Sequence, residues 1–400
     1  MLLTLALLSA IAPLATDMYL PGLPALGDDL STSTSTVQLT LTTFMAGLGV
    51  GQLIVGPLSD GWGRRTLLLG GTVLFAISGL LCAIAPSAGV LIAARLLQGF
   101  SGGAAIVLAR AVIADRAKGD VAAKLFSIMM IIGGVAPVLA PLAGGALLGP
   151  IGWRGIFWVL AGAGVVMVLG VLALIPETLE PERRHTGGLG ALAHNVRYVV
   201  GNRRFVGYAL TFMFGFGALF SYISASPFVV QDVLGLTPGQ FSIVFGVNSI
   251  GIVLGSIVNT RLIGRFHARQ LLSFGVLLLL VAGVALTLEV TVGGTHRAVV
   301  LPLLFAVTTA IGFIMGNATA LGQSEVPNAA GTGSALMGAG QFGLAAVVSP
   351  LVGGAATGMA TSILVCAAIA VLALFTLTRP GRADTSAETF ADEAPAPAEA

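Results

Sequence analysis

Runs of about twenty apolar residues follow one another along the chain, separated by short polar segments. A helix rises 1.5 Å per residue, so about 20 residues are needed to cross the roughly 30 Å hydrocarbon core of a bilayer. Charged residues make up 9% of the sequence, whereas soluble proteins carry about 25%. Helices built from such runs have no polar face to present to water. The sequence therefore predicts an integral membrane protein made of helices.

The apolar runs predict an all-α protein with twelve transmembrane helices. We expect helices at residues 2–23, 37–57, 66–85, 89–115, 126–148, 157–175, 205–230, 240–263, 271–292, 298–323, 333–354 and 361–377. The predicted domains are a six-helix bundle at 1–175, a cytoplasmic linker at 176–204, a second six-helix bundle at 205–378 and a disordered cytoplasmic tail at 379–400. Residues 189–200 fit either a helix on the inner membrane surface or a plain linker.

Basic residues gather on one side of this topology. Of the 19 Lys and Arg residues, fifteen fall in segments expected on one side, and only Arg154 and Arg297 on the other. Arg95 and Arg110 lie within one predicted helix. Because positively charged loops stay in the cytoplasm, we expect a multi-pass protein of the inner (plasma) membrane with both termini cytoplasmic.

The two halves of the chain repeat each other. The matching pairs are Gly47 and Gly51 with Gly251 and Gly255, and PLAGGA at 141–146 with PLVGGA at 350–355. Matching helices run in the same direction, so the two bundles are predicted to be related by an axis along the membrane normal.

A short charged turn between the second and third predicted helices carries the first resemblance to a known family. The pattern Gly56-x-Leu58-x-Asp60-x-x-Gly63-Arg64-Arg65 resembles the signature loop of the major facilitator superfamily, although Gly61 stands where that family usually has a basic residue. Two readings are open for the charges there: a cytoplasmic latch between helices 2, 4 and 11, or solvated interface charges that contribute little. The residues of the predicted latch are Asp60, Gly63, Arg64, Arg65, Arg110 and Asp115.

Asp17 is the acid that lies well inside the first predicted helix. An ionisable group there is costly and suggests a function; alternatively, Pro21 and Pro24 end the helix early and Asp17 caps it. The segment TDMYLPGLP at 16–24 resembles the first helix of the bicyclomycin/chloramphenicol-resistance (Bcr/CflA) branch of drug:proton antiporters. The resemblance implies that Asp17 couples protons to substrate. Some related antiporters have a second acid two turns earlier, where this chain has Ser9.

The segment RLLQG at 95–99 resembles the motif of helix 4 in the same family. Asp17 and Arg95 are both expected about 9 Å below the outer surface, so the two charges could meet, and Arg95 would then keep Asp17 ionised. The other reading is that Arg95 snorkels or binds backbone carbonyls. The predicted site for protons and substrate consists of Asp17, Arg95, Gln98 and Tyr19.

The segment GGVAPVLAPLAGG at 133–145 resembles the Gly/Pro-rich motif of helix 5 that is found mainly in exporters. Its residues are Gly133, Gly134, Pro137, Pro141, Gly144 and Gly145. We expect the glycines to let helix 8 pack against it, although small residues also serve helix packing in general. Residues that could line a cavity are Phe216, Phe220, Tyr222, Asn248, Asn317 and Gln341; the aromatic ones could instead face lipid, and the amides could bond between helices.

Several classes of protein are excluded. The sequence has no GxxxxGK[ST] loop, so ATP does not drive it directly. No nucleophile–base set indicates an enzyme, and the four histidines lack metal spacing, so we predict no cofactor and no metal. The resemblance implies proton-coupled export of small amphipathic drugs or antibiotics by alternating access. The alternative is a proton-coupled importer or facilitator of a small nutrient or metabolite. For the predicted exporter, the expected partners are a small amphipathic substrate, protons and the lipid bilayer, with no nucleic acid. We expect the protein to be a monomer.

Overall fold

Long helices dominate the chain in the computed structural model, which describes residues 2–116, 119–179 and 196–378. The helices are α1 (Leu2–Asp17), α2 (Leu23–Asp29), α3 (Thr34–Trp62), α4 (Arg64–Ala83), α5 (Ala88–Arg116), α6 (Gly119–Leu174), α8 (Arg203–Phe228), α9 (Pro238–Leu262), α10 (Ala268–Leu288), α11 (Arg297–Ser324), α12 (Ala330–Val352) and α13 (Ala356–Leu377). Short 3-10 or π segments lie at Leu20–Gly22, Val229–Val233, Glu289–Gly293 and Pro327–Ala329.

Helix α6 contains two of the predicted spans. It is 56 residues long, which at 1.5 Å per residue is about 84 Å, far more than one bilayer crossing requires. Its backbone leaves the helical region at Gly152, where φ is 65° and ψ is 178°. The described residues contain eleven segments apolar and long enough to span a membrane, and the one at Val135–Leu174 holds the turn at Gly152. With that segment counted as two helices, the predicted all-α fold with twelve spans is confirmed.

The first predicted helix is broken in the middle of its membrane span. Helix α1 ends at Asp17, not near residue 23 as the sequence predicted, while the apolar span continues from Thr4 to Asp29. The break has a local cause, because Pro21 has no N–H to donate and Pro24 opens α2. Asp17 therefore lies at an interrupted helix within the membrane span.

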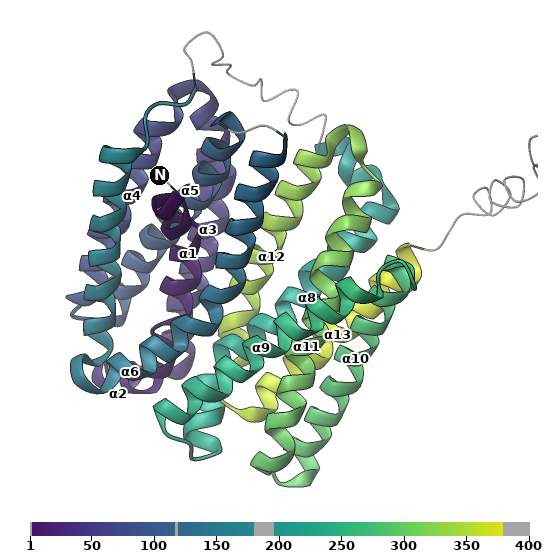
Figure 1. Cartoon of the computed structure of the whole chain (residues 1–400). Coiled ribbons are helices and arrows are strands. Elements are labelled where there is room, and N and C mark those ends of the chain that lie inside the picture. The colour runs from purple at the N-terminus through teal and green to yellow at the C-terminus, as the bar shows by residue number, and fades with distance from the viewer. Residues whose placement is uncertain (1, 117–118, 180–195, 379–400) are drawn as a thin grey trace, which may run out of the picture.

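The helices form two groups, which Figure 1 shows as purple-to-blue helices on one side and teal-to-yellow helices on the other. Within each group, glycines bring two helices into backbone contact: a Cβ on Gly51 of α3 would lie 2.2 Å from the carbonyl oxygen of Phe100, and one on Gly255 of α9 would lie 2.3 Å from that of Thr309. The repeated glycines thus play the same part in both halves. The predicted division at 176–204 stays a prediction, since 180–195, like the tail at 379–400, lies outside the described residues.

The two halves are hydrogen-bonded to each other at the end of the molecule where α3 begins, which we call the Ser33 end. Gln38 Nε2 donates to the carbonyl oxygens of Ser224 (3.2 Å) and Gly353 (2.8 Å), and Ser349 Oγ donates to the Gln38 carbonyl (3.3 Å). We call these four residues the Gln38 clasp. The described hydrogen bonds between halves lie from this end to mid-membrane. They close the Ser33 end of the protein.

Candidate functional site

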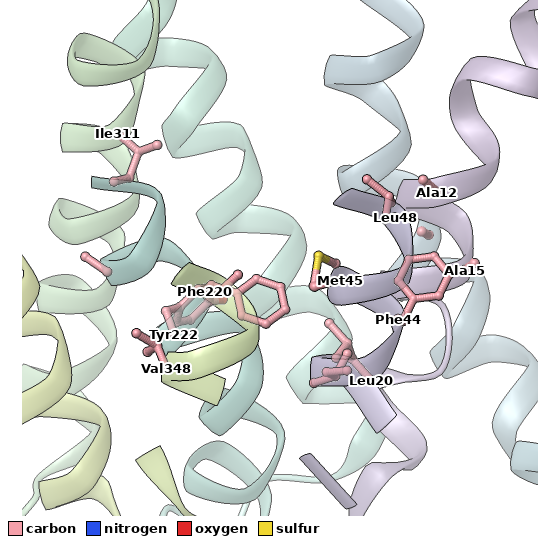
Figure 2. Packing of buried hydrophobic residues seen from close by; sticks show 14 of the residues in the cluster. Ala12, Ala15, Leu20, Phe44, Met45, Leu48, Phe220, Tyr222, Ile311 and Val348 are labelled. Carbon is pink, nitrogen blue, oxygen red and sulfur yellow. The ribbon is translucent and has the colours of Figure 1, made fainter. Parts of the chain in front are cut away.

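A cavity of about 780 Å³ lies between the two halves. Asp17 and Met45 belong to its wall in the first half, and Phe216, Phe220 and Tyr222 to its wall in the second. Figure 2 shows Met45 and Phe220 on facing helices of the two halves. Most of the lining is apolar or aromatic, which suits an amphipathic molecule with a flat, apolar body.

The cavity extends from Asp17 toward the opposite end of the protein, which we call the Gly63 end because α3 and α4 meet there. Arg110, six residues before the end of α5, lines this part of the cavity, as does Ile252, ten residues before the end of α9. With the clasp shut at the Ser33 end, the cavity is accessible from the Gly63 end.

Asp17 is 5% exposed, at the last position of α1, and lines the cavity. Its Oδ1 atom has no hydrogen-bond partner in the described part of the chain. A carboxylate at a helix C-terminus faces the negative end of the helix dipole, and an unpaired charge in apolar surroundings is costly. The local packing gives no structural reason for an acid at this position, which indicates that Asp17 has a functional role.

Arg95 is fully buried behind the cavity wall, in a box of aromatic rings. Its guanidinium carbon lies 4.1 Å from the ring centre of Phe44 and 4.6 Å from that of Tyr19. Its Nη1 atom donates to the carbonyl oxygen of Ala15 (3.0 Å) and to Gln98 Oε1 (2.7 Å). The bond to Ala15 puts Arg95 level with the end of α1, as the sequence predicted.

The charge pair expected from the sequence is not present in this conformation. No ion pair or hydrogen bond links Arg95 to Asp17 among the described residues. Arg95 instead donates to the backbone carbonyl of Ala15, two residues before Asp17, which agrees with the alternative interpretation that Arg95 binds backbone carbonyls. Tyr19 and Gln98 also lie behind the wall, where Tyr19 Oη bonds to Thr40 Oγ1 (3.0 Å). Of the four residues predicted for protons and substrate, only Asp17 faces the cavity.

The charged turn at the Gly63 end is held by a compact polar network. Gly63 joins α3 to α4 with φ 92°, a conformation that favours glycine. Arg64 Nε pairs with Asp115 Oδ2 at 3.1 Å, and Asp115 also accepts from the hydroxyl of Thr178 at 3.0 Å. Although burial disfavours its charge, Glu177 has a lowered pKa because backbone N–H groups of residues 179, 64, 65 and 178 donate to its carboxylate. The network ties α4 and α5 to the start of the linker.

The predicted latch differs from this network in its partners. The hydrogen bonds of Arg64 and Arg65 include those to residues of the first half of the protein and to Glu177 at the start of the linker. Arg110 lies in the cavity wall and takes no part in it. The side chain of Asp60 lies outside the described residues. In this conformation the Gln38 clasp joins the two halves at the opposite, Ser33 end.

The helix 5 motif packs against the segment that follows α1 and against α9. A Cβ on Gly144 would lie 1.8 Å from the carbonyl oxygen of Met18, and one on Gly145 would lie 2.2 Å from Ser242 Oγ of α9. Helix α9, the predicted helix 8, therefore packs against this motif as expected. Pro137 lines the cavity and its carbonyl accepts from Ser249 Oγ (3.3 Å), while Pro141 is buried; the surroundings of Gly133 and Gly134 lie outside the described residues.

The amides predicted as cavity residues lie behind the wall or away from it. Asn248 Nδ2 donates to Tyr222 Oη (2.8 Å), and Asn317 Nδ2 donates to Asn259 Oδ1 (2.6 Å), so both make interhelical bonds. Gln341 is not among the lining residues, but the next residue, Phe342, is. Sequence reasoning missed Phe342, Phe245 and the cavity position of Arg110. Phe245 lies three residues before Asn248, about one helical turn from a residue that the sequence did single out.

Comparison with known proteins places the whole chain in one family. The model of the Major Facilitator Superfamily matches residues 5–350. The chain is 40% identical over 380 residues to an uncharacterized MFS-type transporter, YdgK, of Bacillus subtilis, covering 94% of each chain. It is 31% identical to a bicyclomycin resistance protein homolog of Haemophilus influenzae (94% and 96% covered) and 27% identical to the multidrug resistance protein MdtL of Escherichia coli O157:H7 (94% and 95%).

Solved structures agree on the fold. A D-xylose-proton symporter superposes with a TM-score of 0.72 at 18% identity, covering 94% of this chain and 96% of its own. A bacterial homolog of the human lysosomal transporter Spinster, in an inward-facing and unoccupied conformation, gives 0.73 at 16% identity (99% and 98%). The family match and the relatives establish a membrane transporter, not an enzyme. The chain is a member of the Major Facilitator Superfamily.

Proposed function

We propose that this protein exports small amphipathic drugs or antibiotics across the inner membrane in exchange for protons. The observation that carries the proposal is Asp17, an unpaired and buried acid in the wall of an aromatic cavity between two six-helix groups. Relatives named for bicyclomycin and multidrug resistance support the drug class. The glycine contacts of the helix 5 motif with α1 and α9 support the exporter assignment.

The proposed cycle has two states. With the Ser33 end shut, substrate enters the cavity from the Gly63 end. In the proposed exchange the binding of substrate and the binding of a proton oppose each other, so by linkage substrate binding favours loss of the proton from Asp17. The halves then rock, the Gln38 clasp opens, and substrate leaves. A proton entering from the Ser33 end neutralises Asp17 and resets the protein.

Orientation follows from the arginines, which are concentrated at the Gly63 end, so we assign that end and both termini to the cytoplasm. Cysteines placed at Ser31 and at Asn328 are expected to react oppositely with an impermeant maleimide added to sealed cells: Ser31 labelled, Asn328 protected. The native Cys82 and Cys366 are buried and give a low background. Labelling of Asn328 from outside would reverse the assigned topology.

Replacing Gln38 by alanine is expected to shift the protein toward the state that is open at the Ser33 end. The change removes the two side-chain hydrogen bonds that Gln38 donates to the second half, each worth about 1 kcal/mol, so the population ratio changes by roughly thirtyfold. A cysteine at Ser224 should then react faster with the maleimide in Gln38→Ala than in the parent. Thr36→Ala, at the exposed start of the same helix, is the control. Equal rates would show that the clasp does not hold the Ser33 end shut.

A drug panel tests the function as a whole. Cells with and without the gene are loaded with chloramphenicol, bicyclomycin and other amphipathic compounds, and accumulation is measured before and after an uncoupler. The proposal predicts that the protein lowers accumulation of at least one compound and that the uncoupler abolishes the difference. Accumulation that the protein raises instead would identify an importer.

A further inference from the structure

Arg110 is a cation in the cavity wall without an acidic partner. Among the described residues that line the cavity, Arg110 is the one cation and Asp17 the one acid. Three arginines near the membrane ends have ion-pair partners: Arg64 with Asp115, Arg154 with Asp29 and Arg204 with Glu325. No described acid lies within ion-pair distance of Arg110. The cavity wall therefore presents one positive charge that no described acid neutralises.

No neighbouring side chain described below neutralises the charge of Arg110. Ile106, one turn earlier on α5, and Met129 of α6 line the same part of the cavity and are apolar. Asp115, the nearest acid along α5, accepts from Arg64 and Thr178. The side chain of Arg110 is exposed to the cavity rather than packed like that of Arg95.

Asp17 is too far away to be the missing partner. Arg95 donates to the backbone of Ala15, so the Asp17 end of the cavity is level with Arg95. Arg110 follows Arg95 by fifteen residues on α5, which is about 22 Å along the helix axis. The two charges therefore mark opposite ends of one apolar cavity.

We propose that Arg110 binds an anionic group of the substrate, a carboxylate, sulfonate or phosphate, while the apolar body of the molecule lies against Phe216, Phe220 and Phe342. This proposal rests on the cavity being the transport site, and it narrows the substrate class to amphipathic anions. A guanidinium suits these oxyanions because it can donate two parallel hydrogen bonds. An anion held at Arg110 leaves Asp17 free at the far end, so substrate and proton occupy different groups.

Three probes with one apolar body and different charges test the proposal: naphthalene-2-sulfonate, the neutral naphthalene-2-sulfonamide and 2-naphthylmethylammonium. Binding is measured by equilibrium dialysis to the full chain in nanodiscs of uncharged (zwitterionic) lipid, with empty nanodiscs subtracted. The parent is expected to bind the sulfonate at least tenfold more tightly than the sulfonamide or the ammonium. Arg110→Gln is expected to lower sulfonate affinity about tenfold, equivalent to about 1.4 kcal/mol, and to leave sulfonamide affinity unchanged.

Two further variants complete the test. Arg110→Lys should keep most of the sulfonate affinity, because it keeps the charge, and Arg116→Gln, at the end of α5 outside the cavity, should keep all of it. Sulfonamide binding reports that each variant is folded. The proposal is overturned if the parent binds the three probes equally, or if Arg110→Gln and Arg116→Gln weaken the sulfonate equally. Equilibrium binding needs no proton gradient, so these results are independent of whether the protein exports drugs.

Discussion

Replacing Asp17 by asparagine is expected to abolish export against a gradient while leaving a folded protein that still binds drug. Asparagine has nearly the same shape as the protonated acid but cannot release a proton. Without a titrating group in the cavity, substrate and proton movements are no longer linked. Drug accumulation in cells that express the variant should equal that in cells without the gene, and affinity in detergent should change by less than about threefold.

Asp232→Asn is the matched control for this variant. Asp232 is an exposed acid in the π segment at the Ser33 end, outside the cavity. Its replacement should leave export at the parent level. If Asp17→Asn still exports drugs and the export still collapses with an uncoupler, Asp17 is a structural residue, and Asp115 and Glu325 are the next acids to examine.

Replacing Arg95 by alanine is expected to destabilise the first half of the protein by about 3–5 kcal/mol, the cost of breaking a buried polar network. The guanidinium fills a site between Phe44, Tyr19 and Phe157. It donates to the carbonyl oxygens of Ala15 and Thr40 and to Gln98 Oε1. Alanine would leave a void and three buried acceptors without their donor. Thermal unfolding in detergent should show a much lower midpoint.

Arg110→Ala is the control for the stability of Arg95→Ala, because Arg110 projects into the cavity and makes no described ion pair. Its unfolding midpoint should stay close to that of the parent. Arg95→Lys should fall between, since an ammonium keeps the charge but not the planar face that stacks on the rings. Equal midpoints for Arg95→Ala and Arg110→Ala would contradict the structural role assigned to Arg95.

The fold could be predicted from the sequence because a bilayer imposes one length on every helix. Residues 37–57 and 89–115 were expected as spans, and α3 and α5 contain them. One prediction of a helix end was wrong for a local reason. The helix is interrupted after Asp17 by Pro21 and Pro24. Because membrane helices also tolerate proline without breaking, the two prolines alone did not predict this interruption. The break predicted between residues 148 and 157 is present as a turn at Gly152, a single residue with positive φ.

The site was less predictable, because motifs identify residues but not their partners. Asp17 was found from the cost of burying an acid, and its place in the cavity agrees with that argument. The sequence also put Arg95 at the right depth in the membrane. Depth along a helix axis, however, does not determine toward which neighbouring helix a side chain points. Arg95 turns toward Phe44 and Ala15, whereas Arg110, on the same helix, lines the cavity. Phe342 was missed because its neighbour Gln341 carried the polar group.

The most direct measurement of the central claim is proton release by the purified protein in weakly buffered detergent when the substrate identified by the drug panel is added. If substrate binding deprotonates Asp17, the parent should release up to about one proton per molecule bound, near the pH at which Asp17 titrates in the empty cavity. Asp17→Asn should bind the same compound and release none. Equal proton release from the parent and from Asp17→Asn would contradict the claim that this acid couples protons to export.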